Sequence, residues 1–350
     1  MEYHPHIIPL EAQKKLQCDW KGGVLLRSTN WLGDLLMTLP AAWQLSRALP
    51  QGAHFAVLCP ASLAPLWKAT PWVTNVIGMA KARVSSTEIA QARSLNLGVG
   101  VIFPNSFGAA WDVRRCGIPR RIGRKGRFRS LLLTDTIREW PRATGAGEFH
   151  QLSWYLELVS ALAPVEWKAE YPPLQIDTAD AVALGMRPEE RWLLLAPGAA
   201  YGPAKQWPME HFLEIARRWA TNGGRIVAVG SQKEANLTRT LAEGCSAVLD
   251  LGGKTTLSQL MGICRLARYA VCNDSGAMHL AAACGTRGTA VFGSTDPIAT
   301  GPLGAPWRMV VSSAQCRPCF QRTCSCDKPY HCLREITPDL VWEEMQNDIL

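Results

Sequence analysis

Residues 192–200 have the sequence Trp-Leu-Leu-Leu-Ala-Pro-Gly-Ala-Ala, a continuous apolar run followed directly by small residues. Three later runs also end in loops of small and hydroxyl-bearing residues: 226–229, 270–272 and 289–292, followed by loops 230–231, 273–276 and 293–297. Parallel strands that are buried on both faces have continuous apolar sequences of this kind. Ligands of open α/β sheets bind beyond the carboxyl ends of the strands. The four loops together therefore predict a nucleotide pocket.

The first half of the chain has a similar alternation of segments. It predicts strands at 24–27, 54–59 and 98–103 and helices at 34–49, 61–69 and 151–163. A connector with Tyr171-Pro172-Pro173 precedes the second series, which starts at Trp192. Because 350 residues exceed one ordinary core, two domains are expected. We predict an α/β protein of two Rossmann-like, doubly wound domains, residues 1–170 and 171–350, that face each other across a cleft.

Composition excludes several classes of protein. Hydrophobic residues make up 47% and charged residues 19%, as in globular proteins. The sequence has no apolar run long enough for a membrane span and no signal peptide at its start, which predicts a cytoplasmic protein. The motifs of P-loop ATPases, dinucleotide dehydrogenases and nucleophile-elbow hydrolases are missing. No Asp-x-Asp pair follows a strand, so we expect no metal or other cofactor.

Part of the net charge of +8 is concentrated in one stretch. Asp112 and Asp135 flank it, and its basic residues are Arg114, Arg115, Arg120, Arg121, Arg124, Lys125, Arg127 and Arg129. Such a stretch is either a solvated basic face or a site for phosphates, on an acceptor, a membrane or a nucleic acid. Nucleic acid is disfavoured because no recognised nucleic-acid-binding motif accompanies the stretch.

Asp34 follows the first predicted strand, in the sequence Asn30-Trp31-Leu32-Gly33-Asp34. Gly33 permits a tight strand-to-helix turn with unusual backbone angles. A carboxylate at the start of a helix is stabilised by the dipole and by free N–H groups. Asp34 is therefore either a helix cap, which the spacing alone favours, or a general base that projects into the interdomain cleft.

Two loops of the second half suit an anionic ligand. Small residues in 198–208 expose N–H groups to phosphate oxygens, and Lys205 adds a positive charge. Residues 273–279 place Asp274 and Ser275 at the start of another helix. Asp274 is awkward beside a diphosphate unless it accepts from sugar hydroxyls or from Lys205, which favours a donor with both a phosphate and a polyol. His279 alone is more typical of a packed helix residue than of a ligand.

The chain has 12 cysteines, and five of them lie together near the C-terminus: Cys316, Cys319, Cys324, Cys326 and Cys332. Their density suits a structural zinc or iron–sulfur site, but their spacing is not that of a standard zinc finger. An unligated thiol-rich segment is the favoured interpretation, and disulfides are disfavoured in a reducing cytosol.

Five motifs in combination resemble glycosyltransferase family 9, and within it the lipopolysaccharide heptosyltransferase II group. They lie, in this order, at residues 27–34, 103–106, 196–208, 273–279 and 292–297, and the resemblance extends over residues 22–335. It implies a GT-B fold and an inverting, metal-independent transfer of heptose from ADP-L-glycero-β-D-manno-heptose. The implied acceptor is the first heptose of the lipopolysaccharide inner core (heptosyl-Kdo2-lipid A).

The resemblance also implies roles for residues. Asp34 would be the general base, and Lys205 would contact the donor phosphates. The other implied donor-binding residues are Ala200 and Tyr201 through their backbone, Ser275 and Gly276 at the phosphates, His279 by the diphosphate, Glu234 near the ribose, Thr255 in the adenine pocket and Asp274 at the heptose hydroxyls. The first domain would bind the acceptor, with Asn105, Arg120, Arg121 and Arg124 as candidates.

Arginines suit the anionic Kdo and lipid A phosphates of such an acceptor, which implies peripheral contact with the cytoplasmic face of the inner membrane. Two alternatives stay open. One is a family 9 enzyme with another nucleotide-sugar or acceptor, and the other is a non-catalytic protein that binds a nucleotide-sugar or anionic lipid. The segment before residue 22 has no assigned role.

Overall fold

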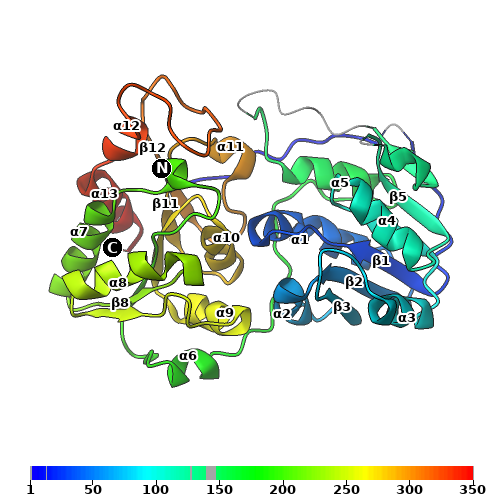
Figure 1. Ribbon diagram of the computed structural model, residues 1–350, viewed down its shortest axis with the longest axis horizontal. Coiled ribbons are helices and arrows are strands. Elements are labelled where there is room, and N and C mark those ends of the chain that lie inside the picture. The colour runs from blue at the N-terminus through cyan, green and yellow to red at the C-terminus, as the bar shows by residue number, and fades with distance from the viewer. Residues whose placement is uncertain (1, 13, 127, 139–146, 350) are drawn as a thin grey trace. The chain divides into compact units, whose positions relative to one another are not determined.

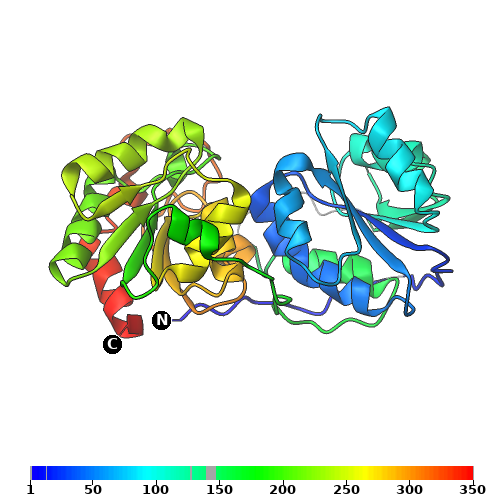
Figure 2. The same cartoon turned by 90° about the horizontal axis from the view of Figure 1, so that it is seen from below.

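The computed structural model describes residues 2–12, 14–126, 128–138 and 147–349 (Figure 1). The chain forms two compact units. The N-terminal unit comprises Ile7–Thr144 and Phe149–Gln175, and the C-terminal unit comprises Ile176–Leu350 together with Met1–His6 and Gly145–Glu148. Each unit contains one six-stranded parallel sheet with helices on both faces (Figure 2), which confirms the predicted α/β class.

The sheet of the N-terminal unit has the strand order β3-β2-β1-β4-β5-β6. Its strands are β1 (Gly23–Arg27), β2 (His54–Pro60), β3 (Asn75–Met79), β4 (Val99–Ile102), β5 (Arg120–Arg124) and β6 (Asp135–Ile137). Its helices are α1 (Leu32–Arg47), α2 (Ala64–Lys68), α3 (Ser86–Ser94), α4 (Phe107–Arg115) and α5 (Leu152–Ser160), with short 3-10 turns η1 (Ala61–Leu63) and η2 (Arg129–Leu131). The strand order reverses between β1 and β4, and such switch points are where open α/β sheets bind ligands.

The sheet of the C-terminal unit has the order β12-β11-β10-β7-β8-β9, with its switch point between β7 and β10. Its strands are β7 (Trp192–Ala196), β8 (Arg225–Ala228), β9 (Val248–Asp250), β10 (Tyr269–Asn273), β11 (Gly288–Phe292) and β12 (Trp307–Val311). Its helices are α6 (Ala179–Ala183), α7 (Met209–Thr221), α8 (Ala235–Gly244), α9 (Leu257–Leu266), α10 (Gly276–Ala283), α11 (Pro297–Thr300), α12 (His331–Arg334) and α13 (Pro338–Ile349), with 3-10 turns η3 (Pro203–Lys205) and η4 (Gln232–Glu234).

Buried side chains fix the loop that follows β7. Asn273, at the end of β10, donates its amide N–H to the Pro197 carbonyl (2.7 Å) and accepts from the Trp207 N–H (3.0 Å). The Trp207 indole is buried and donates to the Ile336 carbonyl (2.8 Å). The loop between β7 and α7 is therefore tied at both ends to the core of its own unit.

The structure corrects one local expectation. Gly33 lies inside α1, which begins at Leu32, so the predicted tight turn with unusual backbone angles at Gly33 is wrong. Trp31 is the N-cap residue, and Asp34 is the third residue of the first helical turn rather than a cap. Among the described residues, no helix combines the length and the apolarity that crossing a membrane requires.

Candidate functional site

A buried ion pair joins two loops of the C-terminal unit. The ammonium of Lys205, at the end of η3, lies 2.5 Å from a carboxylate oxygen of Asp274, in the loop after β10. The Thr295 hydroxyl, in the loop after β11, donates to the same oxygen at 2.5 Å. Asp274 is only 4% exposed. Of the two partners considered for Asp274, Lys205 is the one that the structure shows, and three strand-end loops meet at this carboxylate.

Three buried polar atoms beside this pair have no hydrogen-bond partner within the described part of the chain: Ser275 Oγ, His279 Nδ1 and Ser294 Oγ. Ser275 precedes α10, and His279 lies in its first turns. Burial lowers the pKa of His279 to about 4, so its ring is neutral at physiological pH. Buried polar atoms are nearly always paired, and these atoms therefore point to a ligand. An anion fits, because the hydroxyls can donate, the first N–H groups of α10 have no acceptor within the helix and Lys205 is cationic.

Tyr201 connects the pair to the cysteine-rich segment. The Lys205 ammonium lies 4.7 Å from the centre of the Tyr201 ring, and the Arg322 guanidinium carbon lies 5.1 Å from it. The Tyr201 hydroxyl donates to the Phe320 carbonyl at 2.5 Å. Two cations therefore contact one aromatic ring at the edge of the candidate site.

Backbone and arginine contacts hold the cysteine-rich segment on these loops. The Ala204 N–H donates to the Arg322 carbonyl (3.1 Å), and the Phe320 N–H donates to the Ser294 carbonyl (2.7 Å). Arg317 donates to the carbonyls of the loop after β11, at 3.2 and 3.0 Å. Sequence reasoning missed Arg317 and Arg322. Their only signal is two cations among the cysteines, because their partners are backbone groups that no motif encodes.

The predicted ribose and adenine residues lie at the ends of β8 and β9. Glu234 accepts from the N–H and the hydroxyl of Ser231, at 2.8 and 2.7 Å. A Cβ on Gly198 would lie 2.2 Å from the Glu234 carboxyl carbon, so a larger residue at position 198 would displace the Glu234 side chain. Thr255 is half-buried in the loop before α9. Ala200, in the loop after β7, is exposed. All of these residues follow the carboxyl edge of the same sheet.

Asp34 and Asn105 follow neighbouring strands of the N-terminal unit. Asp34 is in the first turn of α1, which follows β1, and Asn105 is in the loop after β4. The buried side-chain oxygen of Asn105 has no hydrogen-bond partner among the described residues. Burial and the nearby Asp34 carboxylate raise the pKa of Tyr155. The two predicted residues therefore lie at the switch point of their sheet, where a polar ligand would meet both.

The basic residues of the stretch 114–129 do not all reach solvent, because two of its arginines are buried. Arg124 is 1% exposed and its guanidinium lies 2.7 Å from the buried carboxylate of Glu157. Arg129 is fully buried. A direct acceptor contact by Arg124 is therefore contradicted, because burial and the ion pair engage it inside the unit.

Arg120 and Arg121 are half-buried, and both have partners within the chain. Arg120 pairs with Asp135 through two contacts at 3.0 and 3.2 Å. Arg121 donates to the carbonyls of Leu132 (2.6 Å) and Ile118 (2.8 Å). A role for these two arginines at an acceptor stays a prediction.

The five clustered cysteines are free thiols. Hydrogen bonds that the Cys326 thiol donates to Cys316 and Cys324 raise the pKa of Cys326 to about 11. Burial raises the pKa of Cys332 to about 11, and Cys319 adds to that rise. Within the described ranges, no three His, Cys, Asp or Glu side chains form a group that could hold a metal ion. The unligated thiol-rich segment and the zinc or iron–sulfur site both stay predictions.

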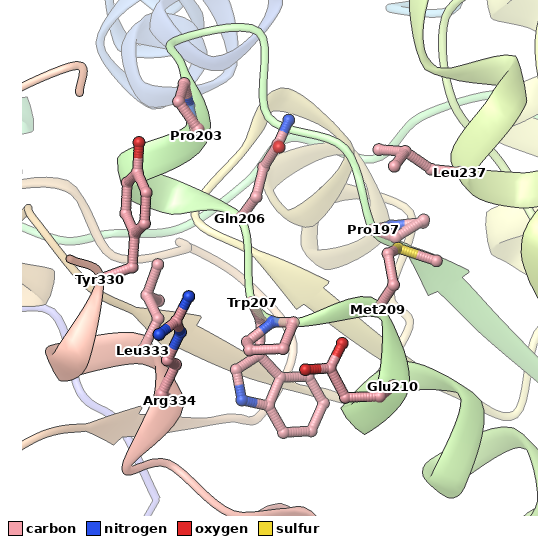
Figure 3. Close-up of a pocket in the computed structure, with 11 residues that line it drawn as sticks. Pro197, Pro203, Gln206, Trp207, Met209, Glu210, Leu237, Tyr330, Leu333 and Arg334 are labelled. Atoms are coloured by element: carbon pink, nitrogen blue, oxygen red, sulfur yellow. The ribbon is translucent and has the colours of Figure 1, made fainter. Parts of the chain in front are cut away.

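A separate pocket of about 270 Å³ lies beside the loop after β7 (Figure 3). Tyr330, Leu333 and Arg334 line it on one side, and Met209 and Leu237 on the other (Figure 3). None of the predicted donor-binding residues lines this pocket. The candidate ligand site is therefore the group of unpaired polar atoms around Asp274 and not this cavity.

Comparisons with known proteins agree with the motifs. The family described as glycosyltransferase family 9 (heptosyltransferase) matches residues 93–330. The chain is 28% identical over 307 residues to lipopolysaccharide heptosyltransferase 2 of Escherichia coli K12, with 82% of this chain and 87% of that protein covered. It is 27% identical over 347 residues to lipooligosaccharide heptosyltransferase 2 of Haemophilus ducreyi, with 92% and 98% covered. The solved structure of the E. coli ADP-heptose lipopolysaccharide heptosyltransferase II superposes with a TM-score of 0.77 at 26% identity, over 93% of this chain and 97% of that one.

Proposed function

This chain belongs to glycosyltransferase family 9, and we propose that it transfers heptose from ADP-L-glycero-β-D-manno-heptose to the inner-core heptose of lipopolysaccharide. The relatives at 27–28% identity carry heptosyltransferase names, and the structural relative is named for ADP-heptose. The observation that carries the proposal is the set of three unpaired buried polar atoms around the Lys205–Asp274 pair, because a sugar diphosphate would satisfy them.

The donor would bind at the carboxyl edge of the C-terminal sheet. Lys205 and the N–H groups at the start of α10 would neutralise the diphosphate as its negative charge grows during bond cleavage. His279 is neutral and adds no charge of its own, so it serves as a hydrogen-bonding group. Asp274 would accept from heptose hydroxyls while it keeps Lys205 oriented. Glu234 and Thr255, further along the same edge, would contact the ribose and the adenine.

The acceptor would be activated by Asp34. The carboxylate takes the proton of the acceptor hydroxyl, the hydroxyl oxygen bonds to the anomeric carbon, and the bond from that carbon to the diphosphate breaks. ADP leaves with the bonding electron pair, and the anomeric configuration inverts. Asn105, with its unpaired buried oxygen, would accept a hydrogen bond from an acceptor hydroxyl.

The test is incubation with ADP-heptose and lipopolysaccharide truncated after its first heptose, followed by mass spectrometry of the product. We expect the addition of one heptose. Asp34→Asn should abolish turnover and leave ADP binding unchanged, while Asp180→Asn, which changes an acidic residue in the first turn of another helix, should leave both unchanged. Near-normal turnover of Asp34→Asn would contradict the base assignment.

Two further outcomes separate the alternatives. Stabilisation of the fold by UDP or GDP more than by ADP would indicate another nucleotide-sugar, because a ligand stabilises the state that binds it. Tight ADP-heptose binding without product would indicate a non-catalytic binder. Because the proposed acceptor is a membrane lipid, we place the protein at the cytoplasmic face of the inner membrane, in peripheral contact with it.

A further inference from the structure

Four large apolar side chains of the N-terminal unit point to solvent and form what we call the exposed apolar surface: Phe107 (47% exposed), Trp111 (41%), Phe128 (87%) and Leu131 (83%). The first two lie on α4, where their rings stack with centres 6.5 Å apart. Phe128 immediately precedes η2 and Leu131 ends it, and η2 packs against α4. Exposed apolar side chains that gather in one place mark an interaction site more often than single ones do.

The loop that displays Phe128 and Leu131 is anchored from within. Arg129 lies between them, is fully buried and donates to the carbonyl of Pro104, in the loop after β4. Leu132, the next residue after η2, is 4% exposed. Phe128 has a φ of +58°, a conformation that is unfavourable for a bulky residue. The buried residues Arg129 and Leu132 therefore fix the loop, and Phe128 and Leu131 are held in solvent.

The charge beside the exposed apolar surface is positive. Arg114 and Lys125 are exposed next to it. Residues 107–138 contain two acidic side chains, Asp112 and Asp135. Asp112 is buried beside an arginine, and Asp135 is paired with another. The accessible charge in this region therefore comes from cations, which complements an anionic partner.

We propose that the exposed apolar surface docks on a lipid bilayer that contains anionic lipids. Aromatic rings and leucine beside cations are the combination that inserts at a membrane interface, where rings lie among the headgroups and cations meet anionic lipids. The surface follows the carboxyl ends of β4 and β5, at the same edge of the sheet as Asp34 after β1. Docking there would bring the edge that carries the proposed base to the bilayer. The inference deepens the proposed function, because it supplies access to an acceptor that is itself a membrane lipid.

The experiment is vesicle flotation with phosphatidylcholine alone and with a 7:3 mixture of phosphatidylcholine and phosphatidylglycerol. We expect the wild-type protein to bind the mixed vesicles. The double variant Phe128→Asn, Leu131→Gln should bind them at least about tenfold more weakly, because each substitution removes an apolar side chain that the bilayer would bury. Asparagine tolerates positive φ, so the loop should keep its conformation. Leu340→Gln, which changes a half-exposed leucine of α13, is the matched control and should bind like wild type.

Three results would overturn the inference. The first is that the double variant binds mixed vesicles as well as the wild type does, and the second is that the wild type does not bind them. The third is a wild-type dimer in sedimentation that the double variant does not form, which would assign the surface to a second copy of the chain. Turnover of a soluble, deacylated acceptor tests the proposed function without the membrane. The double variant should turn over that acceptor at the wild-type rate and the vesicle-embedded acceptor more slowly. If the wild type turns over neither acceptor, the proposed function fails, while the vesicle result still decides the docking surface.

Discussion

Replacing Lys205 by alanine tests whether its ammonium serves the donor or only the fold. The substitution leaves the Asp274 carboxylate, 4% exposed, with the Thr295 hydroxyl as a donor but without its cation. Removal of one partner from a buried ion pair costs about 3–5 kcal/mol. Because the Lys205 side chain is 13% exposed, we expect the lower end of that range in the free energy of unfolding.

The same substitution should weaken ADP binding separately. A hydrogen bond to a charged group contributes about 1.5–3 kcal/mol, so the dissociation constant for ADP should rise about 10- to 100-fold. The double variant Lys205→Ala, Asp274→Asn removes the stranded charge and should recover most of the stability but not the ADP affinity. Asp274→Asn alone should retain ADP binding, since it removes a negative charge beside the diphosphate, and should lose heptose transfer.

Urea unfolding and calorimetric titration with ADP measure the two effects independently. Lys233→Ala, which changes an exposed lysine of η4 in the same unit, is the control and should change neither quantity. A role for Lys205 at the donor would be refuted if Lys205→Ala bound ADP within twofold of wild type, or if the double variant regained both stability and affinity. Either result would make the Lys205–Asp274 pair purely structural.

Two further predictions concern neighbours of the pair. Burial lowers the pKa of His279 to about 4, so on acidification the unfolded chain takes up this proton before the folded chain does. The free energy of unfolding should therefore fall as the pH is lowered from about 6.5 to about 4, by about 3 kcal/mol at most. His279→Gln should remove this part of the pH dependence in urea titrations, and an unchanged slope would contradict the burial argument. Arg322→Ala, at an exposed arginine over Tyr201, should weaken ADP binding a few-fold in calorimetry without destabilising the fold, whereas Arg239→Ala, at an exposed arginine of α8, should have no effect.

The strands of the C-terminal sheet were predictable because their sequences are apolar, but β5 of the N-terminal sheet was not predictable. The four runs that ended in small residues predicted β7, β8, β10 and β11 to within one or two residues. β5 has the sequence Arg-Arg-Ile-Gly-Arg, which resembles a solvated basic segment. Its burial depends on Glu157, a carboxylate 33 positions later that pairs with Arg124. Local sequence does not contain a partner at that distance, so it cannot distinguish these buried arginines from exposed ones.

The candidate site divides in the same way. The residues near Asp274 were predictable because loops at the ends of adjacent parallel strands necessarily meet. The contacts of Arg317 and Arg322 were not, since they depend on how an irregular segment folds back onto carbonyl groups. The cysteine spacing singles out that segment, but two residues between the cysteines, Arg317 and Arg322, make its contacts with the site.

The unpaired polar atoms of the site would contribute to the free energy of donor binding. Ser275 Oγ and Ser294 Oγ are buried without partners among the described residues, and each such group costs about 1–3 kcal/mol when it is left unsatisfied. Asp274, in contrast, already has two partners, Lys205 and Thr295. A ligand that brings acceptor oxygens to the serines, and hydroxyls to the carboxylate, therefore gains more than one that brings an anion alone. This difference favours a sugar diphosphate over a free nucleotide, and it predicts that ADP-heptose raises the unfolding temperature more than ADP does at equal saturation.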